Sequence, residues 1–253
     1  MSVLKKAEML KEAEETKRPI ARFANLTVDE AYQIQLDQIQ AKVKNGATIV
    51  GKKIGLTSKA MQEMFQVNEP DYGHLLDCMM YPDGASISLS SFIQPKVEFE
   101  MAFVLKKDLS GPGVTLLDVI DATEYIVPAI EIIDSRIKDW DITFENTVAD
   151  NGSSAGAVIG INPIPIDKVD VTKTGMVVYR NGAYLDAASS GAVMGNPARA
   201  VQWLANALSR YDISLYKGEV ILSGALTKAV QVEKGDRFTV IFDHLGTVSC
   251  SFE

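Results

Sequence analysis

Apolar positions recur every three to four residues across positions 4–13, which is the spacing of one face of an α-helix. Pro19 ends this pattern, because proline cannot continue a helix. A second apolar face begins after Thr27, and Thr27 and Glu30 have the spacing of a capping box, in which each side chain bonds the other residue's backbone amide. The pattern therefore predicts an N-terminal helical arm of two helices, residues 1–47.

From Gly51 onward, short apolar runs with Gly and Pro between them replace the helical spacing, which is typical of strands. Asn181-Gly182 suits the positive φ angles of a two-residue hairpin turn. Asn196-Pro197 has the cap and first-turn residues of a single helix. We therefore expect one mixed, mostly antiparallel unit of the α+β class, residues 48–253. The segments predicted as strands are residues 96–105, 125–134, 157–161, 175–180, 219–222, 237–242 and 247–252.

The excess of acidic over basic residues limits the kinds of molecule that the chain is expected to bind. The chain has 253 residues, with 25 Lys and Arg against 33 Asp and Glu, and its formal net charge is −8. It has no basic run longer than a lysine pair, so we expect no nucleic-acid partner, because a polyphosphate is bound through clustered cations. No stretch approaches the ~18 apolar residues of a membrane span, and the N-terminus lacks the apolar segment of a signal peptide. The two distant cysteines, Cys78 and Cys250, favour a reducing compartment, so we expect a cytoplasmic protein without a membrane partner.

Two of the predicted strands carry acidic residues among apolar ones. Glu98 and Glu100 alternate along one strand, so both point to the same face, and Glu131 lies in a second apolar strand. One interpretation is that this face is solvated. The alternative is that the three carboxylates meet, where their repulsion is costly unless a hard divalent ion such as Mg²⁺ binds their oxygens. The third acid favours the metal site.

Lys53 is a candidate for a functional cation. It lies in an apolar run between two glycines, and a buried lysine needs a negative partner such as a substrate carboxylate. Adjacent residues of an extended segment face opposite sides, so we expect Lys52 to point to solvent if Lys53 points inward. The alternative is that Lys53 itself faces solvent. Asp77 is likewise an acid in apolar surroundings, with a turn or cap residue as the alternative interpretation.

Small residues with hydrogen-bonding groups gather in two segments beside apolar runs. Asn151 and Ser153 lie in the first, and Ser223 lies in the second. These segments are interpreted either as plain turns or as loops whose backbone amides line an anion pocket. The two imidazoles, His74 and His244, do not form a pair that would suggest a zinc site.

Five segments in order carry the motifs of a known family. They are GKKIGLTSKA at residues 51–60, EPDYG at 69–73, the Glu98 and Glu100 pair, DSRIKDW at 134–140 and TVADN at 147–151. Together they resemble the 2-hydroxypenta-2,4-dienoate (2-oxopent-4-enoate) hydratases of aromatic meta-cleavage pathways, over nearly the whole chain. These hydratases belong, with the 4-oxalocrotonate decarboxylases, to the fumarylacetoacetate hydrolase superfamily.

The resemblance implies a fold, a cofactor and an assembly. The implied fold is a fumarylacetoacetate-hydrolase-like β-roll body with helices packed outside it and a helical arm before it. The implied cofactor is Mg²⁺ or Mn²⁺, bound by Glu98, Glu100 and Glu131. The family's habit further implies a homo-oligomer, and association with a decarboxylase of the same pathway is an additional expectation.

The implied reaction is the addition of water to a 2-hydroxydienoate, which gives a 4-hydroxy-2-oxoacid. Lys53 is then expected to stabilise the substrate carboxylate or enolate, and Asp77 is the expected proton carrier. Two alternatives stay open: a 4-oxalocrotonate-type decarboxylase, and a binding module that keeps the fold without turnover. Hydrolysis is disfavoured, because superfamily hydrolases often use a histidine on an N-terminal lid and no histidine precedes His74. The expected substrate contacts are Asn151, Ser153 and Ser223.

Overall fold

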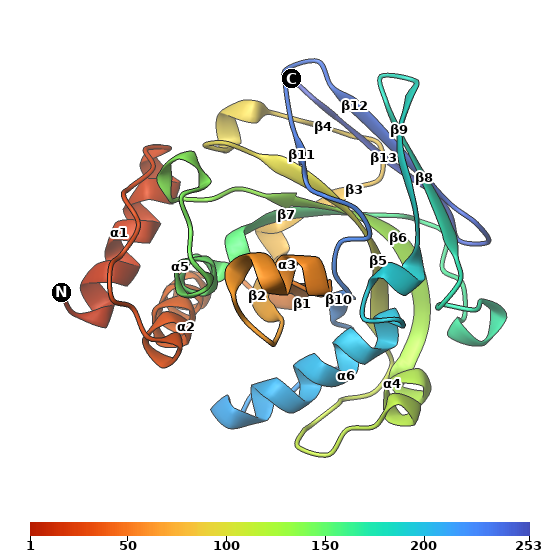
Figure 1. The fold of residues 1–253 in the computed structure, drawn as a ribbon, viewed down its shortest axis with the longest axis horizontal. Helices are drawn as coiled ribbons and strands as arrows, with labels where there is room; N and C mark the ends of the chain where they lie inside the picture. Colours follow the sequence, from red (N-terminus) through yellow and green to blue (C-terminus); the bar gives the residue numbers. More distant parts are fainter.

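The computed structural model describes residues 1–253, which form two β-sheets with helices around them (Figure 1). The helices are α1 (Val3–Thr16), α2 (Val28–Lys44), α3 (Lys59–Phe65), α4 (Leu116–Ala122), α5 (Phe144–Ala149) and α6 (Pro197–Leu208). The strands are β1 (Ile49–Gly55), β2 (Asp71–Leu76), β3 (Met80–Pro82), β4 (Ala85–Ile87), β5 (Lys96–Leu105), β6 (Thr123–Ile133), β7 (Ser154–Ile159), β8 (Gly175–Arg180), β9 (Ala183–Ser189), β10 (Val220–Leu222), β11 (Val230–Gln231), β12 (Arg237–Phe242) and β13 (Gly246–Phe252).

The larger sheet has eight strands and curls round on itself. Its order is β2-β1-β10-β5-β6-β7-β3, with β11 also paired to β5. Four strands lie between β2 and β7 in this order, yet β2 and β7 contact each other directly. The central pair β5 and β6 is antiparallel, and its register places Glu98 opposite Glu131. Side chains on the inner face of β1 can therefore meet those on β6, although the two strands are not neighbours.

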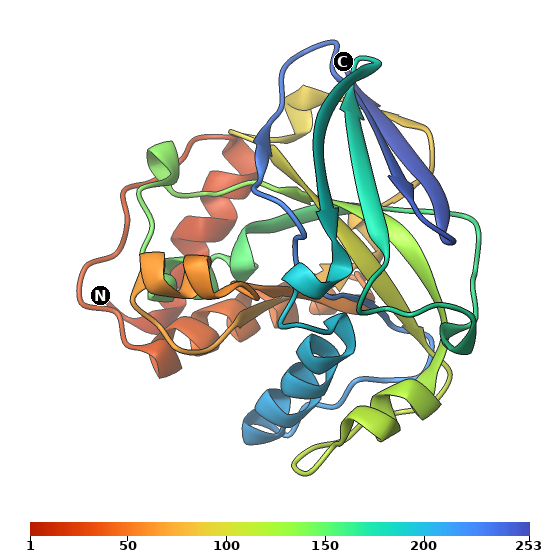
Figure 2. The ribbon, with the colours of Figure 1, turned by 45° about the vertical axis from the view of Figure 1, so that its right-hand side comes forward.

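The smaller sheet, β4-β13-β12-β8-β9, covers the other face of β5 and β6 (Figure 2). Phe99 of β5 packs against Phe238 of β12 with 5.9 Å between ring centroids, and Phe238 packs against Phe252 at 6.2 Å. Because successive residues of a strand alternate between faces, Phe99 directs Glu98 and Glu100 away from this apolar layer. The hydrophobic contacts between the sheets thereby aim both carboxylates at the inner face of the curled sheet.

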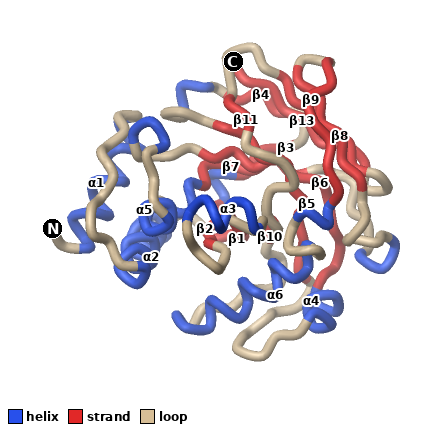
Figure 3. The backbone as a smooth tube through the Cα atoms, in the orientation of Figure 1, coloured by secondary structure: helices blue, strands red, loops and turns tan.

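The arm helices α1 and α2 pack with α5 against one side of the body (Figure 3). Leu10 and Ile34 are fully buried and belong to the same hydrophobic core as the strands. The Gln38 side chain, in α2, donates to the carbonyl oxygen of Ala149 at 2.8 Å. The arm thus shares the core of the body, and its separation as a domain of its own, residues 1–47, stays a prediction.

The element types expected from the sequence are confirmed. Thr27 and Glu30 form the capping box at the start of α2, and Asn196 caps α6. Asn181 and Gly182 take φ angles of 54° and 80° in the hairpin between β8 and β9. Most strand pairs are antiparallel, as expected for a mixed α+β body. No helix combines the length and the apolar character that crossing a membrane requires.

Candidate metal centre and active site

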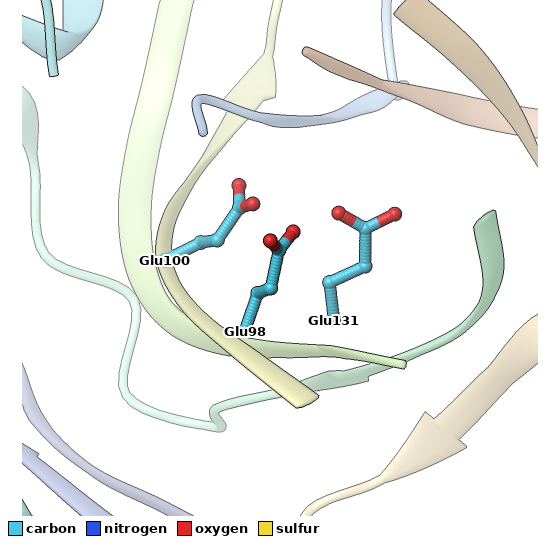
Figure 4. Close-up of side chains that lie close together, drawn as sticks. All are labelled: Glu98, Glu100 and Glu131. Carbon is cyan, nitrogen blue, oxygen red and sulfur yellow. The ribbon is translucent and has the colours of Figure 1, made fainter. Parts of the chain in front are cut away.

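Three glutamates converge on the inner face of the larger sheet (Figure 4). Glu98 and Glu100 come from β5 at a spacing of two, and Glu131 comes from β6, directly across from Glu98. One carboxylate oxygen of each lies within 4.8 Å of those of the other two. Glu100 and Glu131 are fully buried, whereas Glu98 is partly exposed. The predicted meeting of the three acids is confirmed.

Burial and mutual repulsion raise the pKa values of these carboxyls. Burial, followed by the charge of Glu131, raises the pKa of Glu98 to about 7. The same two causes raise the pKa of Glu100 well above its ordinary value. Burial also raises the pKa of Glu131, although the Lys53 ammonium opposes this. Three ionised glutamates in this place therefore need a compensating cation.

The free oxygens of the cluster suit a hard divalent cation. Oε1 of Glu100 and both carboxylate oxygens of Glu131 are buried without a hydrogen-bond partner. Oε2 of Glu100 accepts a hydrogen bond of 2.7 Å from the backbone amide of Gly224, which fixes its orientation. Carboxylate oxygens without other partners are the ligands that Mg²⁺ and similar ions take in proteins. The donor set fits such an ion in the number and the type of its ligands.

Lys53 enters the same space from β1. Its Nζ lies 3.9 Å from Oε1 of Glu131, and the residue is only 3% exposed. Burial by itself lowers the pKa of Lys53, but the charges of Glu131 and Asp71 outweigh this and raise the pKa above its ordinary value. Lys53 thus lies beside the glutamates with its charged form favoured by them, and the prediction that it points inward is confirmed.

Asp71, at the start of β2, is a site residue that sequence reasoning did not single out. It is 1% exposed, and neither of its carboxylate oxygens has a hydrogen-bond partner. β2 pairs with β1 so that Asp71 lies opposite Gly55 and shares the inner face with Lys53. A Cβ atom at position 55 would lie 2.1 Å from Oδ1 of Asp71 and 3.2 Å from Nζ of Lys53, so only glycine leaves room for the pair. The signal available was the EPDYG motif, in which Asp71 precedes an apolar strand.

A left-handed turn, Asn151–Ser153, presses against the Lys53 side chain. All three of its residues have φ angles between 56° and 59°, a conformation that costs free energy outside glycine. Arg136 forms a buried ion pair with Asp150, immediately before the turn, and so holds the turn in place. A Cβ atom on Gly152 would lie 2.7 Å from Cε of Lys53. The turn therefore limits where the Lys53 ammonium can lie.

The three predicted substrate contacts have different surroundings. The Asn151 side chain is engaged with the backbone of His74, accepting from its amide at 2.7 Å and donating to its carbonyl at 2.9 Å. The Ser223 hydroxyl donates to the carbonyl oxygen of Met101 at 2.8 Å. The Ser153 hydroxyl is buried without a partner. Of the three, Ser153 alone keeps its side chain free for a ligand.

Asp77 lies apart from this site. It is exposed at the end of β2 remote from Asp71, and its Oδ1 accepts from the backbone amides of Thr48 and Cys78 at 3.1 and 2.9 Å. The expectation that Asp77 has apolar surroundings is wrong, because the apolar residues before it belong to a strand that ends at Leu76. The geometry favours the alternative interpretation, a turn residue.

The expectation that Lys52 points to solvent is also wrong. Lys52 does face away from Lys53, but it is 1% exposed and pairs with Glu219, whose two carboxylate oxygens both lie 2.7 Å from its Nζ. Neighbouring outer-face residues are covered too: Tyr72 stacks on Tyr32 of α2 with 4.7 Å between ring centroids. Helices therefore bury the outer face of β1 and β2, and alternation alone does not decide exposure.

Replacing Lys52 by Met is expected to destabilise the fold by about 3–5 kcal/mol, because it leaves the buried Glu219 carboxylate without its partner. The double variant Lys52→Met, Glu219→Gln removes both charges and should recover most of this loss. Urea denaturation measures both. Equal destabilisation of the single and double variants would show that the ion pair is not the cause.

His74 is expected to make stability depend on pH. Its ring is buried beside Gln35, and burial, followed by the charge of Lys52, lowers its pKa to about 3. Below its unfolded pKa of about 6.5 the unfolded chain binds a proton that the folded chain excludes, so stability falls by about 1.4 kcal/mol per pH unit as pH drops from about 6.5 towards 3. His74→Gln should remove this contribution, whereas His244→Gln, on an exposed turn, should keep it. Urea denaturation at about pH 7 and about pH 5 measures how the free energy of unfolding of each variant changes with pH. An equal change in both variants would contradict the assignment to His74.

Known proteins resemble the chain over nearly its full length. No protein-family model matches it. The 2-keto-4-pentenoate hydratase of Paraburkholderia xenovorans (strain LB400) is 43% identical over 98% of this chain and 93% of its own. The 2-oxo-hept-4-ene-1,7-dioate hydratase of Escherichia coli is 41% identical over 97% of this chain and 96% of its own.

A solved structure extends the likeness to the fold and the metal. The 4-oxalocrotonate decarboxylase from Pseudomonas putida G7, in complex with magnesium and adipate, is 37% identical and superposes with a TM-score of 0.96 over 99% of this chain and 97% of its own. A divalent cation in that fold and the glutamate cluster here together support a divalent metal cofactor. With several hydratases at 40% identity or more, the chain belongs to the 2-keto-4-pentenoate (2-hydroxypentadienoate) hydratases of the fumarylacetoacetate hydrolase superfamily, which are hydro-lyases.

Proposed function

We propose that this chain adds water to 2-hydroxypenta-2,4-dienoate, or to a close analogue, and so forms a 4-hydroxy-2-oxoacid. The observation that carries the proposal is the meeting of Glu98, Glu100 and Glu131 with an ammonium group, Lys53, in one buried space. Such a site has carboxylates for a metal and a positive charge for an anionic substrate. The kinship with hydratases then selects water addition among the reactions that this arrangement can support.

The proposed ligands of the metal are the three glutamates, and Mg²⁺ or Mn²⁺ is the proposed ion. The unpartnered oxygens of Glu100 and Glu131 and the raised pKa values of all three glutamates support this assignment. When bound, such an ion would supply Lewis-acid polarisation of the substrate's carboxylate and 2-oxygen. The Gly224 amide keeps the Glu100 carboxylate oriented towards the centre.

Lys53 and Asp71 have distinct proposed roles. Three glutamates carry more negative charge than a divalent ion neutralises, so the Lys53 ammonium supplies the positive charge that an enolate and a carboxylate need. Asp71 shares the inner face with Lys53 and has no hydrogen-bond partner, so we assign it, in place of Asp77, the transfer of a proton to or from the substrate. The free Ser153 hydroxyl is the proposed additional substrate contact.

The test is an assay of the purified protein with Mg²⁺ and freshly made 2-hydroxypenta-2,4-dienoate, following the loss of the dienoate's ultraviolet absorbance. Release of CO₂ from 4-oxalocrotonate is the parallel assay, because the decarboxylase from Pseudomonas putida G7 is a close structural relative. Hydration without CO₂ release supports the proposal. Release of CO₂ without hydration would assign the decarboxylase reaction instead.

We further propose that the protein is a cytoplasmic homo-oligomer that associates with a decarboxylase of the same pathway. Leu10 of the arm stripe is buried within the chain, but Leu4 remains 66% exposed and is free to contact another copy. Light scattering at micromolar concentration is expected to give a mass above that of the 27.5 kDa chain. A monomer at that concentration would contradict this expectation.

A further inference from the structure

Lys96 is a cation at the edge of the proposed active site that forms no ion pair with a carboxylate. It stands two residues before Glu98 on β5, so it shares the inner face with the glutamates. The side chain is partly exposed, and its ammonium takes part in no ion pair and no hydrogen bond. The other inner-face cation, Lys53, is paired with Glu131. Lys96 therefore has a charge to offer a ligand.

An aromatic ring fixes the position of this ammonium. Nζ of Lys96 lies 4.0 Å from the centroid of the Trp140 ring, a cation–π contact. The Trp140 indole donates to the carbonyl oxygen of Gln94 at 3.1 Å, which ties the ring to the start of β5. Trp140 also has a φ angle of 55°, a left-handed conformation that a bulky residue adopts only when its surroundings impose it. The fold thus holds the Trp140 ring in the position where it contacts the Lys96 ammonium.

The inner face of β5 becomes more exposed towards Lys96. Along the inner face of β5, Glu100 is fully buried, while Glu98 and Lys96 are partly exposed. Two residues of a strand span roughly 7 Å, so Lys96 lies roughly that far beyond Glu98 along β5. A short carbon chain can span this distance. If the carboxylate and 2-oxygen of the substrate lie at the glutamates and Lys53, the far end of the substrate extends towards Lys96 and Trp140.

We propose that Lys96, held on Trp140, binds a second carboxylate at the far end of the substrate, so that the preferred substrates are 2-hydroxy-2,4-dienoates with a terminal carboxylate. This inference rests on the proposed hydration reaction and narrows its substrate class. An ammonium–carboxylate contact is a charge-assisted hydrogen bond, and a diacid can form it at Lys96 whereas a monoacid cannot. Substrates of both kinds occur among the names of the related hydratases.

The test compares two substrates, 2-hydroxypenta-2,4-dienoate and 2-hydroxyhepta-2,4-diene-1,7-dioate, in the wild type and in Lys96→Met, Lys96→Arg and Lys107→Met. We expect the wild type to have the higher kcat/KM with the dioate. Lys96→Met should lower that value by about 10-fold or more, mainly through KM, and change the five-carbon substrate by less than about twofold. Lys96→Arg should restore dioate turnover. Lys107, an exposed lysine paired with Asp121, is the matched control and should have no effect.

Three results would overturn the inference. Equal losses for both substrates in Lys96→Met would assign Lys96 a general electrostatic role, and unchanged kinetics would show that it does not contact the substrate. Activity of Lys96→Met on the five-carbon substrate shows that its fold and metal site are intact. Hydration of neither substrate by the wild type would refute the proposed function itself, and the inference with it.

Discussion

Lys53→Met is expected to lower kcat by a factor on the order of 10² or more, the usual scale for a positioned electrostatic or acid–base group. Methionine keeps most of the length and the packing of the side chain but removes its charge. The Lys53 ammonium lies 3.9 Å from the Glu131 carboxylate, and Gly55 and Gly152 leave room for it. Without it, the negative charge that develops on the substrate faces glutamates that a divalent ion does not fully neutralise.

The control for this variant must be a lysine outside the site. Lys52 is unsuitable, although it is adjacent, because its buried pair with Glu219 makes Lys52→Met a stability variant. Lys107→Met is suitable, because Lys107 is exposed and its surface ion pair contributes little. Steady-state hydration kinetics, with circular dichroism to check the fold, measure the effect. A folded Lys53→Met protein with nearly full kcat would refute the assignment and would direct attention to Arg136.

Glu131→Gln is expected to lower activity by about 10² or more and to abolish stabilisation by metal. In the wild type, Mg²⁺ at a hundredfold excess over Kd should raise the free energy of unfolding by about 2.7 kcal/mol, because it binds the folded state alone. Glutamine keeps the size of Glu131 but removes one of the three charges that make the cluster unfavourable without a cation.

Thermal melts with EDTA and with millimolar Mg²⁺ measure this effect in both proteins. Glu124→Gln is the matched control, because Glu124 lies on the same strand, β6, and is exposed. It should keep both the activity and the stabilisation by Mg²⁺. Superimposable melts of the wild type with and without Mg²⁺, or full activity of Glu131→Gln, would count against the metal site.

Local patterns in the sequence predicted three of the six helices and seven of the thirteen strands. The capping box at Thr27, the hairpin turn at Asn181-Gly182 and the cap at Asn196 depend only on residues close in the chain, and all three are present. Alternation likewise predicted that Glu98 and Glu100 share a face, because the period of a strand is two regardless of what covers it. Glu131 and Lys53 were also candidates from the residues alone, as charged residues in apolar runs, and the family resemblance assigned their roles.

The exposure of a charged side chain and the identity of its ion-pair partner depended on segments that are distant in sequence. Alternation placed Lys52 on the opposite face from Lys53 correctly, but α2 and α6 cover that face and Glu219 neutralises the charge. Asp77 was the candidate acid, and only the β1–β2 register shows that Asp71, at the other end of β2, shares the inner face with Lys53. No local pattern contains this information.

The sequence by itself determined part of the secondary structure, the metal-binding residue types and the family of this protein, because these follow from local periodicity and from short motifs. The tertiary structure decided which charges meet. The curl of the larger sheet lets side chains of β1 and β6 meet, so that Lys53 reaches Glu131, and the loop after β6 brings Trp140 over Lys96. Those contacts set the electrostatics of the site, because interactions between charges depend on distance and burial, which the order of residues along the chain does not contain.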